Sequence, residues 1–226
     1  METLLDLRDA FFNLDIILRA SPILISGFWM TLKLILTVVP LGLLGGTIVA
    51  LLYTVPSRAV RWPLIVYVDL FRAFPPLVLL VFIYAGLPFA GYEISAFAAV
   101  SLGFFLNTSS YYGEILRAGI ESIPRGQIEA ARSTGLTKWQ AMGWVVLPQA
   151  VHNVLPDLIS NTLEVAKLTS LASVVALPEL LFQARQAQSL TFNATPIMAA
   201  AIVYFVLLWP LVRLLSRLEH RMIAAH

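Results

Sequence analysis

Two pairs of opposite charges interrupt stretches of the chain that are otherwise apolar. Asp69 and Arg72 form one pair, and Glu164 and Lys167 form the other. Residues three apart lie on one face of a helix, so each pair presents both charges on the same side. Ionisable side chains within a membrane are costly, and they face the interior of a helix bundle or a water-filled cavity. Each pair therefore either neutralises itself or lines a route for a polar solute.

For Asp69 and Arg72 we favour self-neutralisation, because a paired charge is tolerated where an isolated one is not. For the second pair, both interpretations stay open. In the pathway hypothesis, the carboxylate binds an ammonium group of the solute, while the lysine and nearby hydroxyl groups bind a carboxylate. Four side chains then line the translocation pathway near the membrane midplane: Glu164, Lys167, Thr169 and Ser170.

The residue patterns of several enzyme classes are missing. The chain has no cysteine, which excludes disulfides, thiolate nucleophiles and Cys-ligated zinc. It contains no HExxH, no GxSxG, no clustered histidines and no GxxxxGKS/T phosphate-binding loop. His152 has no metal-spaced partner, so we assign it a structural role. We predict no catalytic residue, no metal site and no cofactor, and we expect ATP hydrolysis, if any, on another subunit.

The composition is that of a membrane protein. Of the 226 residues, 59% are hydrophobic and 12% are charged, and the mean hydropathy is +0.83. Soluble domains carry about a quarter charged residues. About 20 apolar helical residues cross a bilayer, so we predict an all-α protein with five spans, at residues 26–54, 63–88, 94–118, 145–172 and 195–213. With no linker and no internal repeat, residues 1–226 are predicted to form one membrane domain.

Basic residues predict the orientation of these spans, because Lys and Arg are retained on the cytoplasmic side. Three lie on one side of the predicted spans, namely Arg8, Arg19 and Arg185, and nine lie on the other, namely Arg58, Arg61, Arg117, Arg125, Arg132, Lys138, Arg213, Arg217 and Arg221. The N-terminus is therefore expected outside and the C-terminus in the cytoplasm, which requires an odd number of spans. Residues 1–21 are acidic and amphipathic, which disfavours a signal peptide and predicts an interfacial helix before the first span.

Glycines at helical spacing mark the first predicted span. Gly42 and Gly46 form a GxxxG pattern, which lets two helices approach closely. Packing within the chain and packing across a dimer interface are both possible, and we favour the former. Pro40, Pro75 and Pro76 predict kinks that neighbouring helices accommodate.

The long basic loop at residues 124–148 reads as two capped helices. Pro124 and Gly126 predict a turn, and a short helix is expected at residues 127–134 with Glu129 in its first turn, where the helix dipole favours an acid. Gly135 follows the end of that helix, where a residue in the left-handed conformation is common, so we expect Gly135 to adopt it. Thr137 followed by Gln140 is the capping-box pattern that begins a second helix. A simple connection between two spans does not need two capped helices, so we predict a rigid cytoplasmic element against which a partner docks.

The same loop resembles the signature loop of ABC importer permeases. The matching residues are Glu129-Ala130-Ala131, Gly135 and Val145-x-Leu147-Pro148, with Val145 where that family more often has Ile. In that family the loop is a coupling helix that docks in a groove of the cytoplasmic ATPase. The resemblance therefore implies that Glu129, Ala130, Ala131 and Gly135 couple this chain to an ATPase.

Other blocks are similar to the polar amino acid branch of that family. They are Arg72-x-x-Pro75, Glu114-Ile115-x-Arg117-x-Gly119-Ile120, Lys167-x-Thr169-Ser170-Leu171 and Leu177-Pro178-Glu179-Leu180-Leu181. The resemblance begins at about Gly27 and continues to the C-terminus. One departure bears on the substrate: the family often has an acid between Lys and Thr, where this chain has Leu168.

What the resemblance implies is the permease subunit of a binding-protein-dependent, ATP-driven importer in the bacterial inner membrane, carrying polar amino acids or their derivatives. The implied partners are a cytoplasmic ATP-binding subunit, a second permease subunit (identical or paralogous) and an extracytoplasmic binding protein that docks on residues 172–196. The alternative is a secondary transporter for small polar solutes, although the sequence lacks the repeats that such proteins often show. A net charge of +2 without a basic run gives no reason to expect nucleic acid as a partner.

Overall fold

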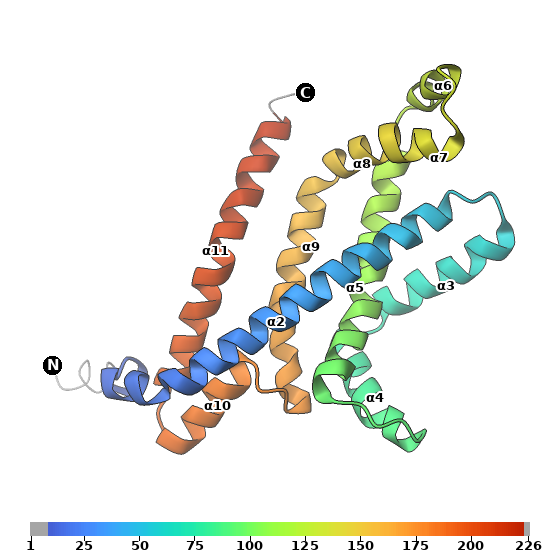
Figure 1. The fold of residues 1–226 in the computed structure, drawn as a ribbon. Coiled ribbons are helices and arrows are strands. Elements are labelled where there is room, and N and C mark those ends of the chain that lie inside the picture. The colour runs from blue at the N-terminus through green and yellow to red at the C-terminus, as the bar shows by residue number, and fades with distance from the viewer. Residues whose placement is uncertain (1–8, 224–226) are drawn as a thin grey trace. The chain divides into compact units, whose positions relative to one another are not determined.

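The computed structural model describes residues 9–223, and the side chains of residues 9–217. These residues form helices and connecting loops without a strand, which confirms the predicted all-α class. In chain order (Figure 1) the elements are α2 (Leu14–Tyr53), α3 (Arg58–Ala73), α4 (Pro76–Phe89), α5 (Ala96–Glu121), α6 (Arg125–Ser133), α7 (Lys138–Ala141), the π-helical turn η1 (Met142–Val146), α8 (Leu147–Asn153), α9 (Leu155–Leu168), the 3-10 helix η2 (Thr169–Val175), α10 (Leu180–Thr191) and α11 (Thr195–Ile223).

The chain divides into two compact units. The first contains the described residues up to Val38, together with Pro76–Gly103 and Leu163–Leu214. The second contains Val39–Pro75, Phe104–Thr162 and the described residues from Leu215 onward. Four helices, α2, α5, α9 and α11, each contribute residues to both units. The single membrane domain over residues 1–226 stays a prediction.

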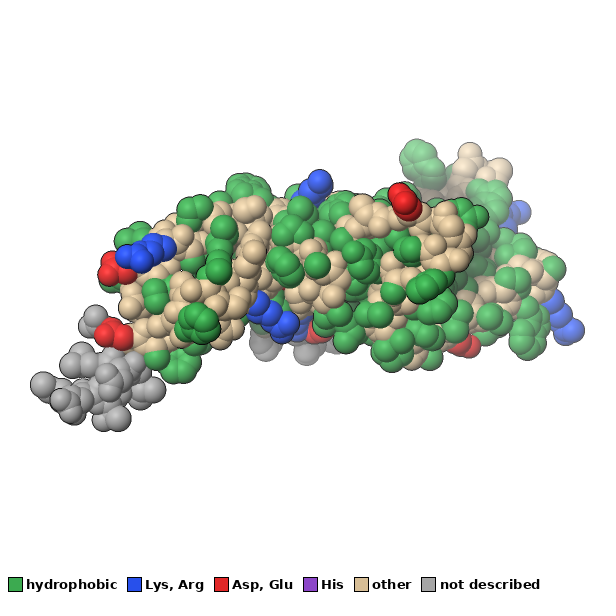
Figure 2. Space-filling view, turned by 90° about the horizontal axis from the view of Figure 1, so that it is seen from below, with side chains coloured by type: hydrophobic (Ala, Val, Ile, Leu, Met, Phe, Trp, Pro, Cys, Tyr) green, Lys and Arg blue, Asp and Glu red, His purple; other side chains and the backbone are tan. Residues whose placement is uncertain are grey.

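Helices that can cross a membrane are present, as predicted. By length and composition, Asp9–Tyr53 and Thr195–Arg217 each qualify. Two helix pairs, each bent at a short break, qualify if each pair is one span: Arg58–Ala73 with Pro76–Phe89, and Leu155–Val175 with Leu180–Thr191. The described residues thus hold two to four candidate spans, and hydrophobic side chains cover much of the face in Figure 2.

The count of five spans and the orientation of the termini stay predictions. The expected third span falls on α5, which has 26 residues but does not pass the same test. Its middle carries four polar residues in a row, at positions 107–110, and all four side chains are buried. These side chains face protein instead of lipid, which lowers the hydropathy of the helix without preventing it from lying in a membrane.

The predicted interfacial helix falls partly outside the described residues, which begin at Asp9. Residues 14–21 are the first turns of α2, which continues without a break to Tyr53. Before them, Asn13 and Asp9 bond to the chain near the start of α11: the Asn13 N–H donates to Thr195 Oγ1 (3.0 Å), and Asn193 Nδ2 donates to the Asp9 carbonyl (2.8 Å). The position of this segment at a membrane interface stays a prediction.

Small residues form the core of the first unit. Figure 1 shows the first turns of α2 beside α10 and the start of α11. The buried residues at this junction are Ala20, Leu24, Leu180, Ala184, Ala187 and Ala200. Alanine allows close approach of helix backbones, which drives association in lipid, where the hydrophobic effect between helices is absent.

A buried carboxylate completes this junction. The Glu179 side chain is fully buried and accepts hydrogen bonds from the N–H groups of Leu181 (2.8 Å) and Phe182 (2.7 Å) at the start of α10. The Tyr204 hydroxyl of α11 donates to the same carboxylate (2.9 Å), and Thr31 Oγ1 of α2 accepts from the Leu180 N–H (3.0 Å). The first turn of α10 is thereby satisfied by its own N-cap side chain and by one side chain of α2, and α11 holds the N-cap carboxylate through Tyr204.

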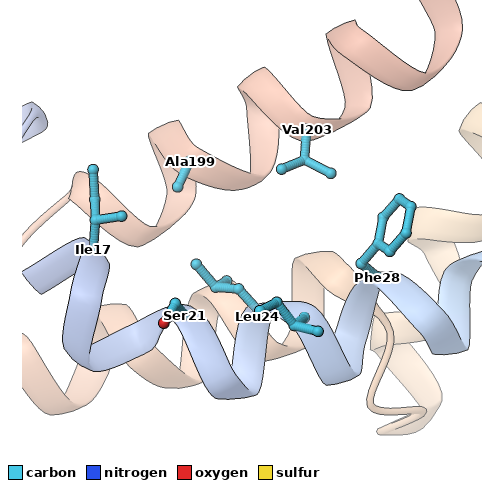
Figure 3. Close-up of a pocket in the computed structure, with 7 residues that line it drawn as sticks. Ile17, Ser21, Leu24, Phe28, Ala199 and Val203 are labelled. Carbon is cyan, nitrogen blue, oxygen red and sulfur yellow. The ribbon is translucent and has the colours of Figure 1, made fainter.

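The same unit has an apolar pocket between α2 and α11. Figure 3 shows Leu24 and Phe28 of α2 on one side of this pocket and Ala199 and Val203 of α11 on the other. The pocket has a volume of about 370 Å³. Its one polar side chain, Ser21, already donates its hydroxyl to the Leu18 carbonyl (2.9 Å). The lining suits hydrocarbon and offers no charged group to a polar solute.

Glycines hold α2 against α5 in the second unit. A Cβ added to Gly42 would lie 2.3 Å from Thr108 Oγ1, and one added to Gly46 would lie 2.5 Å from the Tyr112 Cβ and 2.8 Å from the Gly113 backbone nitrogen. The GxxxG pattern therefore packs within the chain, as predicted. Buried side chains continue this contact, namely Ala50, Tyr112, Leu116, Val154 and Leu158.

We predict that Gly46→Ala destabilises the protein, whereas Gly86→Ala does not. Both glycines are helical, so alanine raises helix propensity at each by up to about 1 kcal/mol. Only Gly46 is in contact with a facing helix, and nothing lies within 4 Å of a Cβ at Gly86. Overpacking at Gly46 should cost about 1–3 kcal/mol, seen as a lower Tm in detergent. Equal Tm values for the two variants would contradict the close α2–α5 contact.

Candidate functional site: the 124–148 loop

The first helix of the loop, α6, has one anchored face and one exposed face. It begins at Arg125 with Pro124 as its N-cap, two residues earlier than predicted, so Glu129 lies in its second turn and not in the first. Ala131 is buried, and Ile128 packs on the loop's own core. The side chains of Glu129 and Ala130 are exposed.

The turn between the two helices has the predicted local geometry. Gly135 has φ +91°, the left-handed conformation that a glycine adopts without strain. Thr137 then caps α7: Thr137 Oγ1 accepts from the Gln140 N–H (3.3 Å), and the Gln140 side chain accepts from the Thr137 N–H (2.8 Å). The capping box predicted from sequence is therefore confirmed.

After α7, the chain continues through η1 into α8, with Pro148 in the first turn of α8. A small apolar core fixes this segment to the end of α5, and its buried residues are Ile123, Met142, Val146 and Ala150. Two tryptophans remain outside it, Trp139 with 60% of its surface exposed and Trp144 with 81%. No sequence pattern indicated that these tryptophans are exposed, because exposure depends on how α7 and η1 pack on the rest of the chain.

Polar contacts also fix the loop to the helices that enter it. Lys138 Nζ donates to the carbonyl of Thr54, in the turn after α2 (3.3 Å). Asn153 Nδ2 donates to Ser122 Oγ after the end of α5 (3.0 Å). In Figure 1, α6 and α7 form a compact hairpin next to the C-terminal end of α5. The loop is thus a folded element attached to α2, α5 and α8 within the second unit.

A chain of charges lies on α3 and α5 close to this loop. Arg117 binds both carboxylate oxygens of Glu114, at 2.9 and 2.7 Å, and also contacts Glu121 at 2.6 Å. Arg72 of α3 lies 3.9 Å from the same Glu114. The expected Asp69–Arg72 pair is wrong: Asp69 makes no hydrogen bond or ion pair with any described residue, because Arg72 turns toward α5. The i, i+3 spacing could have indicated the Glu114–Arg117 pair, but no sequence pattern indicated the partner from α3.

The four residues of the predicted pathway are not all brought together. Lys167 Nζ donates to Glu164 Oε1 at 2.5 Å, and both side chains are more than half exposed. Ser170 follows on the same helical stretch and donates to the Lys167 carbonyl (2.8 Å). Thr169 is fully buried and donates to the Ala166 carbonyl (2.6 Å), away from the exposed pair. Their role in transport stays a prediction.

Among the described residues, no group of three or more His, Cys, Asp or Glu side chains could hold a metal ion. The polar groups of this region are instead ion pairs and helix caps, which suit transmission of movement or binding of a charged solute.

Comparison with known proteins assigns the family. Residues 42–224 match the family described as "Binding-protein-dependent transport system inner membrane component". The chain belongs to this permease family. The match includes the 124–148 loop and the charged residues of α3 and α5.

Two bacterial relatives illustrate the similarity of this permease to others. It is 34% identical over 197 residues to the probable amino-acid ABC transporter permease protein YckA of Bacillus subtilis, covering 87% of each chain. It is 36% identical over 205 residues to the glutamate transport system permease protein GluD of Corynebacterium glutamicum, covering 88% of this chain and 74% of that one.

Solved structures share the fold of this permease. A chain from the crystal structure of an amino acid ABC transporter with histidines has a TM-score of 0.81 and 37% identity, with 91% of this chain and 96% of that one covered. A chain of the MetNI methionine ABC transporter in an inward-facing conformation has a TM-score of 0.72 at 22% identity, over 88% and 95% of the two chains. The latter likeness concerns the fold alone.

We predict that Gly135→Ala loosens the loop of this permease and that Gly126→Ala does not. Nothing lies within 4 Å of a Cβ at either position, but only Gly135 has a positive φ. An alanine in the left-handed conformation lowers the stability of the loop by about 1–2 kcal/mol. The open form of the loop is then about five to thirty times more populated, and the amides that it exposes exchange faster by the same factor. Hydrogen exchange of residues 125–146 measures this. If both variants exchange alike, the loop does not depend on the Gly135 conformation.

Proposed function

We propose that this chain is the membrane permease subunit of a binding-protein-dependent, ATP-driven importer for amino acids, located in the bacterial cell membrane. The observation that carries this function is the family match over residues 42–224, together with relatives and a solved structure named as amino acid ABC transporters. The proposed substrates are polar amino acids or their derivatives. The proposed topology has five spans with the N-terminus outside. We assign ATP hydrolysis to a separate subunit.

The 124–148 loop is proposed as the element that couples transport to ATP hydrolysis. Its anchored face packs on the ends of α5 and α8, while Glu129 and Ala130 remain exposed. Exposed Trp139 and Trp144 add apolar area of the kind enriched at protein interfaces. A folded helical hairpin with an exposed face is suited to docking, because little conformational entropy is lost when it binds. Ala131 contributes to the anchor, and Gly135 to the turn.

The remaining partners follow from the transport mechanism. An ATPase pair closes on ATP binding and displaces this loop, and the displacement changes which side of the membrane the pathway opens to. A second permease subunit, identical or paralogous, would complete the pathway, since few spans are available in one chain to enclose it. A substrate-loaded binding protein would dock outside, on the segment at residues 172–196 that includes α10.

Purification through this chain tests the coupling proposal. We expect an ATPase to accompany the wild-type chain, and Glu129→Ala to reduce the ATPase recovered or its coupling to import by about tenfold, the loss of one important interface contact. Glu93→Ala is the control, because Glu93 is exposed in the short turn before α5, on the predicted opposite side. If no ATPase accompanies the wild-type chain in several mild detergents, the importer function is wrong.

Import kinetics test the pathway hypothesis. Glu164 forms an exposed ion pair with Lys167. An ammonium group of the substrate could therefore replace the Lys167 ammonium group at the Glu164 carboxylate. We expect Glu164→Gln to raise the KM for amino acids by about tenfold, since a hydrogen bond to a charged group contributes about 1.5–3 kcal/mol. Asp157→Asn is the matched control, an exposed acid two turns earlier on α9. An unchanged KM for every substrate tested would mean that Glu164 and Lys167 only neutralise each other.

A further inference from the structure

The C-terminal end of α3 is held against α5 by side chains of α5. Asn107 Nδ2 donates to the carbonyl of Phe71 (2.9 Å), and the Tyr111 hydroxyl donates to the carbonyl of Arg72 (3.3 Å). Both carbonyls lie in the last turn of α3, where a helix leaves its carbonyls without internal partners. In a membrane protein, separation of α3 from α5 would leave these carbonyl groups without hydrogen-bond donors, which lipid cannot supply.

A charged contact joins the same two helices. Glu114 of α5 binds Arg117 of its own helix through both oxygens, and one of those oxygens is 3.9 Å from Arg72 Nη1 of α3. The guanidinium of Arg72 also lies over the Tyr111 ring, 5.3 Å from its centre. The three charged side chains border an open pocket of about 270 Å³, also lined by Asp69. Contacts with Glu114 and Tyr111, and not dense packing, therefore position the Arg72 side chain.

From this network, α5 continues directly into the coupling loop. Arg117 contacts Glu121 in the last turn of α5 (2.6 Å). Two residues later, Ile123 is buried in the core of the loop, and Ser122 accepts from Asn153 of α8. A displacement of the loop must therefore move the end of α5.

We propose that Arg72, Glu114 and Arg117 are positioning residues that make α3 move with α5 when the coupling loop is displaced. This inference rests on the proposed function, because it specifies how the loop acts on the spans. Glu114 is central, since among the described side chains its carboxylate contacts a cation on each of the two helices. Without its charge, the α3 end keeps its two backbone hydrogen bonds but loses the contact nearest to the loop.

The first experiment compares Glu114→Gln with Asp69→Asn in the complete transport complex. Asp69 borders the same pocket but makes no ion pair, so it is a matched control for loss of an acid at this place. We expect Glu114→Gln to raise the ATP hydrolysed per amino acid imported by about fivefold or more, the lower range of coupling between sites. The ATPase recovered with the chain should stay unchanged, and Asp69→Asn should behave as wild type. A merely structural role would lower Tm and recovery without changing this ratio.

A second measurement keeps the inference testable if Glu114→Gln fails to assemble. The chain has no cysteine, so Leu70→Cys and Ala118→Cys place two unambiguous spin labels on exposed positions of α3 and α5. We expect the distance between the labels to be the same in the nucleotide-free and ATP-bound complex, because the two helices move together. A distance that changes on ATP binding would overturn the inference.

The outcomes separate this inference from the proposed function. If the wild-type chain brings down no ATPase, the importer function itself is wrong. If the wild type couples ATP hydrolysis to import and Glu114→Gln does so equally well, the function stands and the positioning role of the Arg72–Glu114–Arg117 network is wrong.

Discussion

Interrupted helices leave backbone groups that lipid cannot satisfy, and the protein supplies the partners from neighbouring helices. The last carbonyls of α3 accept from Asn107 and Tyr111 of α5. The first N–H groups of α10 donate to Glu179, whose carboxylate is itself held by Tyr204. Each break in a helix is therefore also a contact between helices. Within each unit, this requirement determines which helices must stay adjacent.

Close backbone packing works together with these polar contacts. In lipid, apolar side chains gain little by leaving the solvent, so association depends on shape and hydrogen bonds. Gly42 and Gly46 bring α2 onto α5 with no room for a side chain, and alanines do the same where α2 meets α10. The coupling role proposed for the 124–148 loop requires such firm attachment, since a loop that bends on its own would absorb the movement of an ATPase without passing it to the spans.

The two groups of charged residues, around Glu114 and at Glu164 with Lys167, have different surroundings. Around Glu114, two arginines and the end of a helix form a connected network that suits transmission of movement. Glu164 and Lys167 form an exposed pair on α9, where a charged solute can compete with the internal partner. The same i, i+3 spacing thus occurs in two different surroundings, a pair joined to a neighbouring helix and an exposed pair. Spacing alone determines which charges can meet, but not which of them do.

Local features of this protein were determined by the sequence itself. Four features depend on a few adjacent residues or on one helix face, so they can be predicted from the order of the residues. They are the all-α class, the turn at Gly135, the capping box at Thr137 and Gln140, and the close packing at Gly46. Helix limits were predicted less closely: α6 begins at Arg125, directly after Pro124 and two residues before the predicted start. Only the tertiary structure decided that Arg72 turns to Glu114 instead of Asp69, that Thr169 is buried, and that Glu179 bonds to Tyr204 of α11. These are contacts between residues distant in the chain, and their energies depend on burial and orientation that no local pattern contains.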